Sequence, residues 1–348
     1  MRFIWLVLWA PAFLLGQRGG PSAPLTAPIP RIGIIDFYGL RKIPEDRVRK
    51  ALGVREGDPL PPSKEDVEER IEQIPGVVRA KLEAVCCVDG EASLFVGVEE
   101  RGGARFALRS APSGPAVLPD EMLESYQGFL AALREAASHG NEAEDLTRGH
   151  SLMASPEARA YQERFLKFAA EKLPLLRDVL LNSSDAEHRA AAAYMIGYAP
   201  KKSQVVNDLQ TAMQDPDPGV RSNAMRALAA IGVYGARNPE AGIRISPTWF
   251  IEMLNSIVLS DRRYATLALG TLTEDRAESI LNQIRERALD AVVEMARWKT
   301  LEYALPAFIL AGRVGQTPEQ EIHEAWKQGA REAVIEKAIA SAKKRKSP

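Results

Sequence analysis

Four histidines and two cysteines are the residues of this chain whose types could support metal binding, redox chemistry or nucleophilic catalysis. Two of the histidines, His139 and His150, flank a short stretch that contains the acidic residues Glu142, Glu144 and Asp145. Imidazole and carboxylate groups are ligands for divalent metal ions, so a metal-dependent enzyme centred on this stretch is one hypothesis. The alternative, which we favour, is a solvated loop between helices.

The other two histidines are His188 and His323. None of the four belongs to an H-E-x-x-H motif or lies in a G-x-S-x-G or P-loop context. Two cysteines cannot build a four-cysteine zinc site or a disulfide scaffold, and they do not form a C-x-x-C redox motif. We therefore expect a protein that is not an enzyme and has no cofactor, with no catalytic or metal-binding residues. Its binding residues stay unknown at this point.

The two cysteines, Cys86 and Cys87, are adjacent near the end of a predicted strand. Neighbouring strand residues face opposite sides of a sheet, so a disulfide between them would distort the strand. We expect two separate side chains, with Cys87 on the covered face beside Val85 and Leu94 and Cys86 on the other face beside Ser93. An alternative is that an exposed Cys86 cross-links to a partner or to a second copy.

Residues 31–100 predict a small α/β domain with the element order β-α-α-β-β. The last two strands, at about 77–88 and 91–99, are joined by Asp89-Gly90, a dipeptide typical of two-residue hairpin turns. In the final strand, apolar residues alternate with small ones, which indicates a sheet with one covered face.

Four short motifs follow one another within this domain. They are Ile34-Ile35-Asp36-Phe37-Tyr38-Gly39, Gly57-Asp58-Pro59-Leu60, Ile74-Pro75-Gly76-Val77-Val78 and Val96-Gly97-Val98-Glu99-Glu100. In this order and spacing the motifs resemble those of a POTRA domain. The resemblance implies a small sheet with two helices on one face, which binds polypeptides, often by pairing a strand to the sheet edge. The alternative is a domain that only packs or acts as a spacer.

From about residue 174 the helical pattern repeats. The segment Asp185–Gly197 aligns with Asp217–Ala229, and Arg189 matches Arg221 at a spacing of 32 residues. Weaker copies follow at Arg262-Ala265-Leu269-Gly270 and at Leu301-Ala304-Phe308. Helix pairs that repeat every 32 to 47 residues or so are the signature of an α-solenoid.

Residues 215–228, with the sequence DPDPGVRSNAMRAL, resemble HEAT repeats, and the resemblance is clearest over 174–232. It implies an interaction scaffold with a concave face. The alanine content agrees, because 38 of the 50 alanines follow residue 118 and small residues let packed helices approach closely. We interpret Asp217 and Arg221 as structural residues that bond between repeats.

These patterns divide the chain into successive segments. We expect a linker over 101–118, a helical lead-in to the solenoid over 119–173, and HEAT-like repeats over 174–315. A C-terminal helical cap is expected over 316–342 and a basic tail over 343–348. The predicted fold class is multidomain, α+β and all-α, in which a small POTRA-like β-α-α-β-β domain precedes an α-solenoid of HEAT-like helical pairs.

Residues 1–16 carry one positive charge, Arg2, followed by an apolar run. As a helix this run would cover about 20 Å, which is short of the roughly 30 Å hydrocarbon core of a bilayer but suits a signal peptide. We predict a signal peptide at 1–16 and a Pro/Gly-rich tether at 17–30, and hence a periplasmic or secreted protein of the cell envelope. The alternatives are an uncleaved anchor and a start codon placed too early.

The chain has 45 basic and 46 acidic residues and a net charge of −1. Such a balance provides no basic field for nucleic acid. We expect proteins or polypeptide segments as partners, no nucleic acid and no small-molecule substrate, with membrane contact only through an uncleaved N-terminus. The predicted function is a non-enzymatic interaction scaffold of the bacterial envelope that binds through the sheet edge and the solenoid surface. The alternative is a membrane-anchored component of envelope assembly or division.

Overall fold

The computed structural model describes residues 30–88, 90–104 and 107–346. The predicted signal peptide at 1–16 and nearly all of the tether lie outside these residues. Within the described part of the chain, no helix is long and apolar enough to cross a membrane.

The described residues form two compact units. Unit 1 contains 107–250 and 267–272, and unit 2 contains 30–104, 251–266 and 273–346. The helices and strands that lie entirely within unit 1 are α3 (Asp120–Ser138), β4 (Glu144–Asp145), β5 (Leu152–Met153), α4 (Pro156–Glu171), α5 (Leu173–Asn182), α6 (Ala186–Ile196), α7 (Val206–Ala212) and α8 (Pro218–Arg237), with short 3-10 turns at Lys202–Gln204 and Pro239–Ala241. Those of unit 2 are β1 (Arg31–Tyr38), α1 (Glu45–Leu52), α2 (Lys64–Glu72), β2 (Val77–Val88), β3 (Glu91–Glu100), α11 (Glu278–Arg287), α12 (Leu289–Ala296), α13 (Leu301–Val314), α14 (Glu319–Lys327) and α15 (Arg331–Lys346). Helices α9 (Thr248–Met253) and α10 (Leu259–Leu272) contribute residues to both units.

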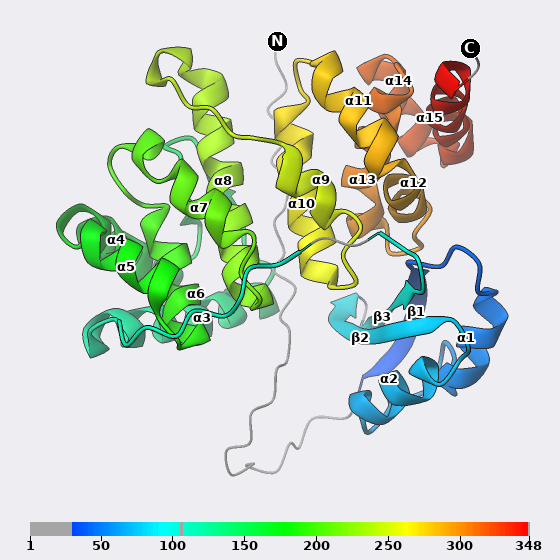
Figure 1. Cartoon of the computed structure of the whole chain (residues 1–348), viewed down its shortest axis with the longest axis horizontal. Helices are drawn as coiled ribbons and strands as arrows, with labels where there is room; N and C mark the ends of the chain where they lie inside the picture. The colour runs from blue at the N-terminus through cyan, green and yellow to red at the C-terminus, as the bar shows by residue number, and fades with distance from the viewer. Residues whose placement is uncertain (1–29, 89, 105–106, 347–348) are drawn as a thin grey trace. The chain divides into compact units, whose positions relative to one another are not determined.

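The sheet of unit 2 has the strand order β1-β3-β2, with β1 parallel and β2 antiparallel to β3. The order β-α-α-β-β along the chain therefore occurs as predicted. Helices α1 and α2 lie along one face of the sheet (Figure 1). Their apolar residues and those of the strands form one core, which includes Ile32, Val48, Ile71, Leu94 and Val96.

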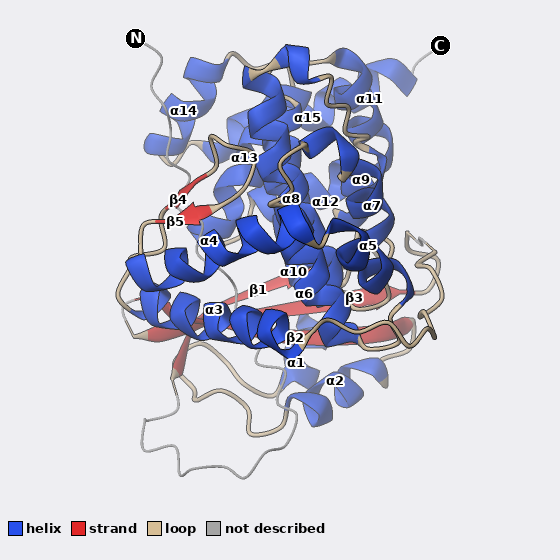
Figure 2. Ribbon diagram, turned by 90° about the vertical axis from the view of Figure 1, so that its left-hand side faces the viewer, coloured by secondary structure: helices blue, strands red, loops and turns tan. Residues whose placement is uncertain are grey.

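The other face of the sheet is covered as well, by helices from the C-terminal part of unit 2 (Figures 1 and 2). Phe95 of β3 is fully buried, and its ring centroid lies 5.2 Å from that of Trp298 and 5.0 Å from that of Tyr303. Ser93, which shares this face, is also buried. The expectation of a sheet with one covered face is therefore wrong, because α10, α12 and α13 supply a second layer.

Carboxylates of the sheet cap two helices in this second layer. Asp36 of β1 accepts hydrogen bonds from the backbone N–H groups of Lys299 and Thr300, at 2.8 and 2.9 Å, where α13 begins. Glu83 of β2 accepts from the N–H of Leu259, the first residue of α10, at 2.9 Å. The first N–H groups of a helix have no partner within the helix, so these acidic residues satisfy donors that would otherwise be buried unpaired.

A buried arginine, Arg262, makes further contacts between the sheet and these helices. Arg262 of α10 lies over the ring of Tyr38 at 4.6 Å, and its Nη1 donates to Glu294 Oε2 at 2.9 Å. The other oxygen of Glu294 accepts the N–H of Gly39 at 2.9 Å. Gly39 has φ +82°, and a Cβ there would lie 2.1 Å from the Val98 carbonyl oxygen, so this close approach requires glycine.

The predicted repeats are present as helix pairs. Helices α5 and α6 form one pair and α7 and α8 the next. The aligned arginines make the same bond: Arg189, Arg221 and Arg262 each donate to the carbonyl oxygen six residues earlier, at 2.9, 2.8 and 2.6 Å. Each guanidinium thus closes the turn that precedes its own helix.

Asp217 also acts within its own repeat, since its side chain accepts the N–H of Val220 at 3.0 Å and caps α8. The bond between successive repeats is made by Arg189, which donates twice to Asp215 at 2.9 Å. The interpretation of Asp217 as a residue that bonds between repeats is thus corrected, because its side chain caps its own helix. For Arg221, bonding between repeats stays a prediction.

The second half of the predicted linker is bound to unit 1. The Arg109 side chain donates to the Leu181 carbonyl oxygen at 3.0 Å and to Asp215, and the N–H of Gly114 donates to the Asn182 carbonyl oxygen at 2.8 Å. This segment therefore runs along the turns of the helix pairs instead of hanging free. At the other end of the chain, α15 continues to Lys346, so the first residues of the predicted basic tail are helical.

Candidate functional site

The stretch His139–His150 does not gather its histidines and carboxylates around one point. His139 is exposed, and its Nδ1 lies 2.9 Å from the Glu135 carbonyl oxygen. Glu144 pairs instead with Arg226, at 2.6 Å. Within the described residues, no group of three or more His, Cys, Asp or Glu side chains is placed to hold a metal ion. The metal-site hypothesis is not supported, because no such group forms there and Arg226 is the partner of Glu144.

The stretch nevertheless contributes to a pocket in unit 1. The pairing of β4 with β5 joins Glu144 and Asp145 to Met153 and Leu152. The end of the expected solvated loop at His150 is buried and contacts Tyr198 of the first repeat. Glu144 and His150 line the pocket together with Tyr194 and Tyr198, from α6 and the turn after it, and with Arg226 of α8. The pocket is small and partly open to solvent.

His150 and Lys202 contact each other at this site, and the pKa of each is lowered. Lys202 Nζ lies 3.1 Å from His150 Nδ1 and donates to the Gly197 carbonyl oxygen at 2.8 Å. Burial, followed by the nearby positive charges of Lys202 and Arg148, lowers the pKa of His150 to about 4. Burial, with a smaller effect of Arg148, lowers the pKa of Lys202 to about 7. At neutral pH the imidazole is therefore uncharged.

Tyrosine hydroxyls extend this polar network behind the pocket. The Tyr198 hydroxyl donates to the Ser151 carbonyl oxygen at 2.9 Å, and the Tyr194 hydroxyl accepts from Gln162 Nε2 at 3.2 Å. Burial raises the pKa of Tyr194 to about 12, so it stays a neutral hydroxyl. The site thus combines aromatic walls with fixed hydrogen-bonding groups, an arrangement typical of binding pockets.

Sequence reasoning identified only part of this pocket. It singled out His150 and Glu144 but missed Arg226 and Tyr194, which line the pocket, and Lys202, which contacts His150. These three lie on the repeat helices or in the turn between them, where their residue types are ordinary. No local pattern marks them, because only the stacking of helix pairs brings them to the 139–150 stretch.

The free edges of the sheet are the second candidate site. On β2, the N–H groups of Ala80 and Leu82 point outward and donate to Glu72 and Glu68 of α2, at 2.9 and 2.7 Å. Such capping of edge groups is a common protection against unwanted strand pairing. The next outward position is Ala84, which is exposed.

On β1, the first half of the free edge is occupied by the chain's own turn. The N–H of Ile32 donates to the Asp58 carbonyl oxygen at 2.8 Å, and the N–H of Gly57 donates to the Ile32 carbonyl oxygen at 2.7 Å. The part of β2 that follows Leu82, whose N–H is bound by Glu68, is therefore the more open edge.

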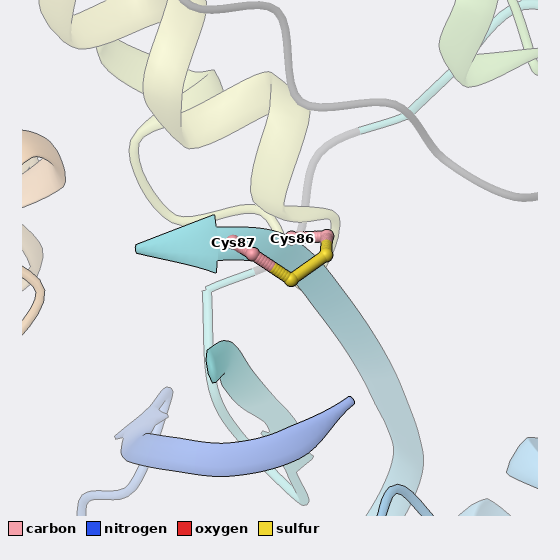
Figure 3. Close-up of a disulfide and its surroundings, with 2 residues drawn as sticks. All are labelled: Cys86 and Cys87. Carbon is pink, nitrogen blue, oxygen red and sulfur yellow. A yellow bond between two sulfur atoms is a disulfide. The ribbon is translucent and has the colours of Figure 1, made fainter. Parts of the chain in front are cut away.

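Cys86 and Cys87 are joined by a disulfide at the end of β2 (Figure 3). Both residues are exposed. The expectation of two separate side chains, one of them buried, is therefore wrong. The pairing of β2 with β3 shifts register between Val85 and Val88, so the regular alternation on which that expectation rested does not hold at the cysteines.

A match to a family model supports the solenoid. Residues 173–242, which include α5 to α8, match the family model described as HEAT repeats. A designed armadillo repeat protein, YIII(Dq)4CqI, is similar with a TM-score of 0.36 and 17% identity, over 55% of this chain and 95% of that one. An engineered protein is similar with a TM-score of 0.35 and 14% identity, over 65% of this chain and 98% of that one. A second designed armadillo repeat protein, YIII(Dq.V1)4CPAF in complex with peptide (KR)4, is similar with a TM-score of 0.35 and 12% identity, over 64% of this chain and 100% of that one.

A search of the curated proteins found no match. The HEAT match confirms that the repeats predicted around 174–232 form part of a helical solenoid. The POTRA-like identity of the sheet region stays a prediction.

Proposed function

We propose that this protein is a non-enzymatic scaffold that binds polypeptides in the bacterial cell envelope. The HEAT-repeat match over 173–242 carries the proposal, because stacked helix pairs of this kind present an extended surface of side chains to a partner. The arginine bonds that close each repeat turn give this surface a rigid support.

The sheet provides a second proposed binding surface. An extended segment of a partner would add to β2 at its exposed end around Ala84, in the manner of a POTRA-like domain. Toward the start of β2 it would compete with Glu68 and Glu72 for the N–H groups of Leu82 and Ala80. Replacing Glu68 and Glu72 with alanine would therefore lengthen the available edge.

The envelope location rests on residues 1–16, which we propose to be a cleaved signal peptide. Sequencing the N-terminus of the exported protein tests this. A start near Gln17 or Pro24 supports cleavage, whereas retention of Met1 in a membrane fraction favours the anchored alternative.

Site-specific photo-crosslinking of the full chain tests polypeptide binding. A crosslinking amino acid is placed at Ala227, which lines the pocket of unit 1, at Ala84 on the open edge of β2, and at Val117 as an exposed control. We expect protease-sensitive adducts at Ala227 or Ala84 but not at Val117. A synthetic peptide that covers the crosslinked partner segment must then bind the purified protein. Adducts absent at both positions, or equal at all three, would contradict the proposal.

A further inference from the structure

The disulfide between Cys86 and Cys87 is poorly placed to stabilise the fold. A disulfide stabilises a protein mainly by closing a loop of the unfolded chain, and the effect grows with the length of that loop. These two cysteines are adjacent in the sequence, so their bond closes no loop of intervening residues. Its position therefore gives no support to a role as a structural cross-link.

The bond is open to attack from solvent. Both cysteines are exposed, and they lie at the end of β2 (Figure 3). Thiol–disulfide exchange begins when a thiolate reaches one of the two sulfur atoms, so access to the bond helps to set the rate. Exposed disulfides are the ones that serve redox and regulatory roles, whereas structural disulfides resist reduction.

The backbone at the cysteines differs from that of a regular strand. The pairing of β2 with β3 shifts register between Val85 and Val88, so that both cysteines of β2 lie opposite Ala92 of β3. One extra residue on one strand is a β-bulge. In a regular strand neighbouring side chains point to opposite faces of the sheet, which holds their sulfur atoms too far apart for a bond. The bond and the bulge therefore occur together.

We propose that Cys86–Cys87 is a redox site that exchanges with a dithiol, and that its reduction allows β2 to pair regularly with β3. The N–H groups that point outward from β2 belong to every second residue, among them Ala80 and Leu82, and the next position is Ala84. In regular pairing this series continues at Cys86. Reduction thus lengthens the open edge of β2, and oxidation shortens it.

The reaction consists of two exchanges. One thiol of the dithiol loses its proton and attacks either cysteine sulfur; the bond between Cys86 and Cys87 breaks, a mixed disulfide forms, and the other cysteine leaves as a thiolate that takes up a proton. The second thiol then loses its proton and attacks the dithiol's own sulfur in the mixed disulfide. The dithiol departs as a disulfide, oxidised by two electrons, and both cysteines are left as thiols.

The rate of reduction in the folded protein is the first test. The oxidised full chain is treated with dithiothreitol in native buffer and in urea at the same pH. Samples are quenched with iodoacetamide, and the alkylated cysteines are counted by mass spectrometry. We expect the two rate constants to agree within about tenfold, because folding does not cover the bond. A larger slowing in the folded protein would show a protected disulfide and overturn the proposal.

The double variant Cys86→Ser/Cys87→Ser is the matched protein without the bond. It should oxidise no dithiothreitol, and its urea midpoint should be no lower than that of the oxidised wild type. The reduced wild type gives the same comparison without any substitution. A lower midpoint in both proteins would assign the bond a structural role and refute the proposal.

Amide hydrogen exchange tests the change in pairing. The chain has only two cysteines, so labelling with ¹⁵N-cysteine gives one amide signal for each. On reduction the ratio of the Cys86 exchange rate to the Cys87 exchange rate should rise by about tenfold or more, because Cys86 then turns to the open edge and Cys87 toward β3. Reoxidation should restore the first ratio. A ratio that does not change with the redox state would overturn the proposal.

The redox site does not depend on the proposed scaffold function. Both the exchange reaction and the strand pairing are measured on this protein alone, without a polypeptide partner. Failure of the crosslinking experiment would therefore leave the redox site standing, and failure of the redox tests would leave polypeptide binding untouched.

Discussion

Glu83 links the sheet of unit 2 to α10, and its replacement by glutamine should stabilise the protein at neutral and higher pH. The carboxylate is 6% exposed and accepts the N–H of Leu259 at 2.9 Å. Burial raises the pKa of Glu83 from 4.5 to about 7, against the smaller lowering effect of the Leu259 hydrogen bond. In Glu83→Gln the side-chain oxygen still accepts from Leu259, but no charge has to be buried.

The sign and size of the effect follow from this pKa. The folded state binds the proton of Glu83 more tightly than the unfolded state does. Below about pH 4.5 the side chain is therefore neutral, and its burial carries no electrostatic penalty for the stability of the wild type. The penalty then grows as the pH rises and is complete above about pH 7. The difference between pKa values of 4.5 and about 7 corresponds to about 3 kcal/mol of unfolding free energy.

Urea unfolding of wild type and variant at pH 4.5, 6, 7 and 8 measures this difference. The fluorescence of Trp298, which packs against Tyr38 and Phe95, follows the region. The stability of Glu83→Gln relative to wild type should increase by about 3 kcal/mol between pH 4.5 and 8. His150 and Lys202 titrate in both proteins and cancel in the comparison.

The matched control is Glu69→Gln, the same chemical change at an exposed position of α2. Its stability relative to wild type should not vary with pH. The reasoning would be refuted if the difference in unfolding free energy between Glu83→Gln and wild type were also independent of pH. It would also be refuted if the variant were less stable than wild type at pH 8.

Three further changes have defined outcomes. Asp215→Ala leaves the buried Arg189 and the half-buried Arg109 without their shared carboxylate, and should lower the unfolding free energy of unit 1 by about 3–5 kcal/mol in urea titrations; an unchanged midpoint would contradict the assigned role. Asp36→Ala removes the acceptor of two N–H groups at the start of α13, and should cost about 1–2 kcal/mol and speed hydrogen exchange at those amides; the argument fails if their exchange is unaffected. Iodoacetamide should label neither Cys86 nor Cys87 before reduction and both afterwards, because the bonded pair is exposed; labelling without reductant, read by mass spectrometry, would show separate thiols.

The parts of this fold that depend on local sequence could be predicted. The order of strands and helices in 31–100 follows from turns and alternation within a few residues. The repeat helices follow from arginines and alanines at regular spacing, and the equivalent bonds of Arg189, Arg221 and Arg262 explain why that spacing recurs.

The parts of the fold that depend on distant residues could not be predicted from the sequence. Phe95 gives no sign in its own strand that Trp298 and Tyr303, some 200 positions later, cover it. His150 and Glu144 were recognised as reactive groups, but their meaning changed once Lys202 and Arg226 lay beside them. The sequence left a metal site open as the less favoured hypothesis, and the cationic partners Lys202 and Arg226 argue against it.

The make-up of unit 2 has a consequence for the order in which the protein can fold. Its sheet lies within residues 31–100 and is synthesised before the helices that cover the second face, the last of which is α13 at Leu301–Val314. Until that part of the chain emerges, Tyr38 and Phe95 have no covering layer and Asp36 has no helix to cap. Unit 1 lies within the intervening sequence, so its folding shortens the effective loop that must close and reduces the entropic cost of joining the two ends. A chain that stops before α13 would therefore expose an apolar sheet face that the later helices normally cover.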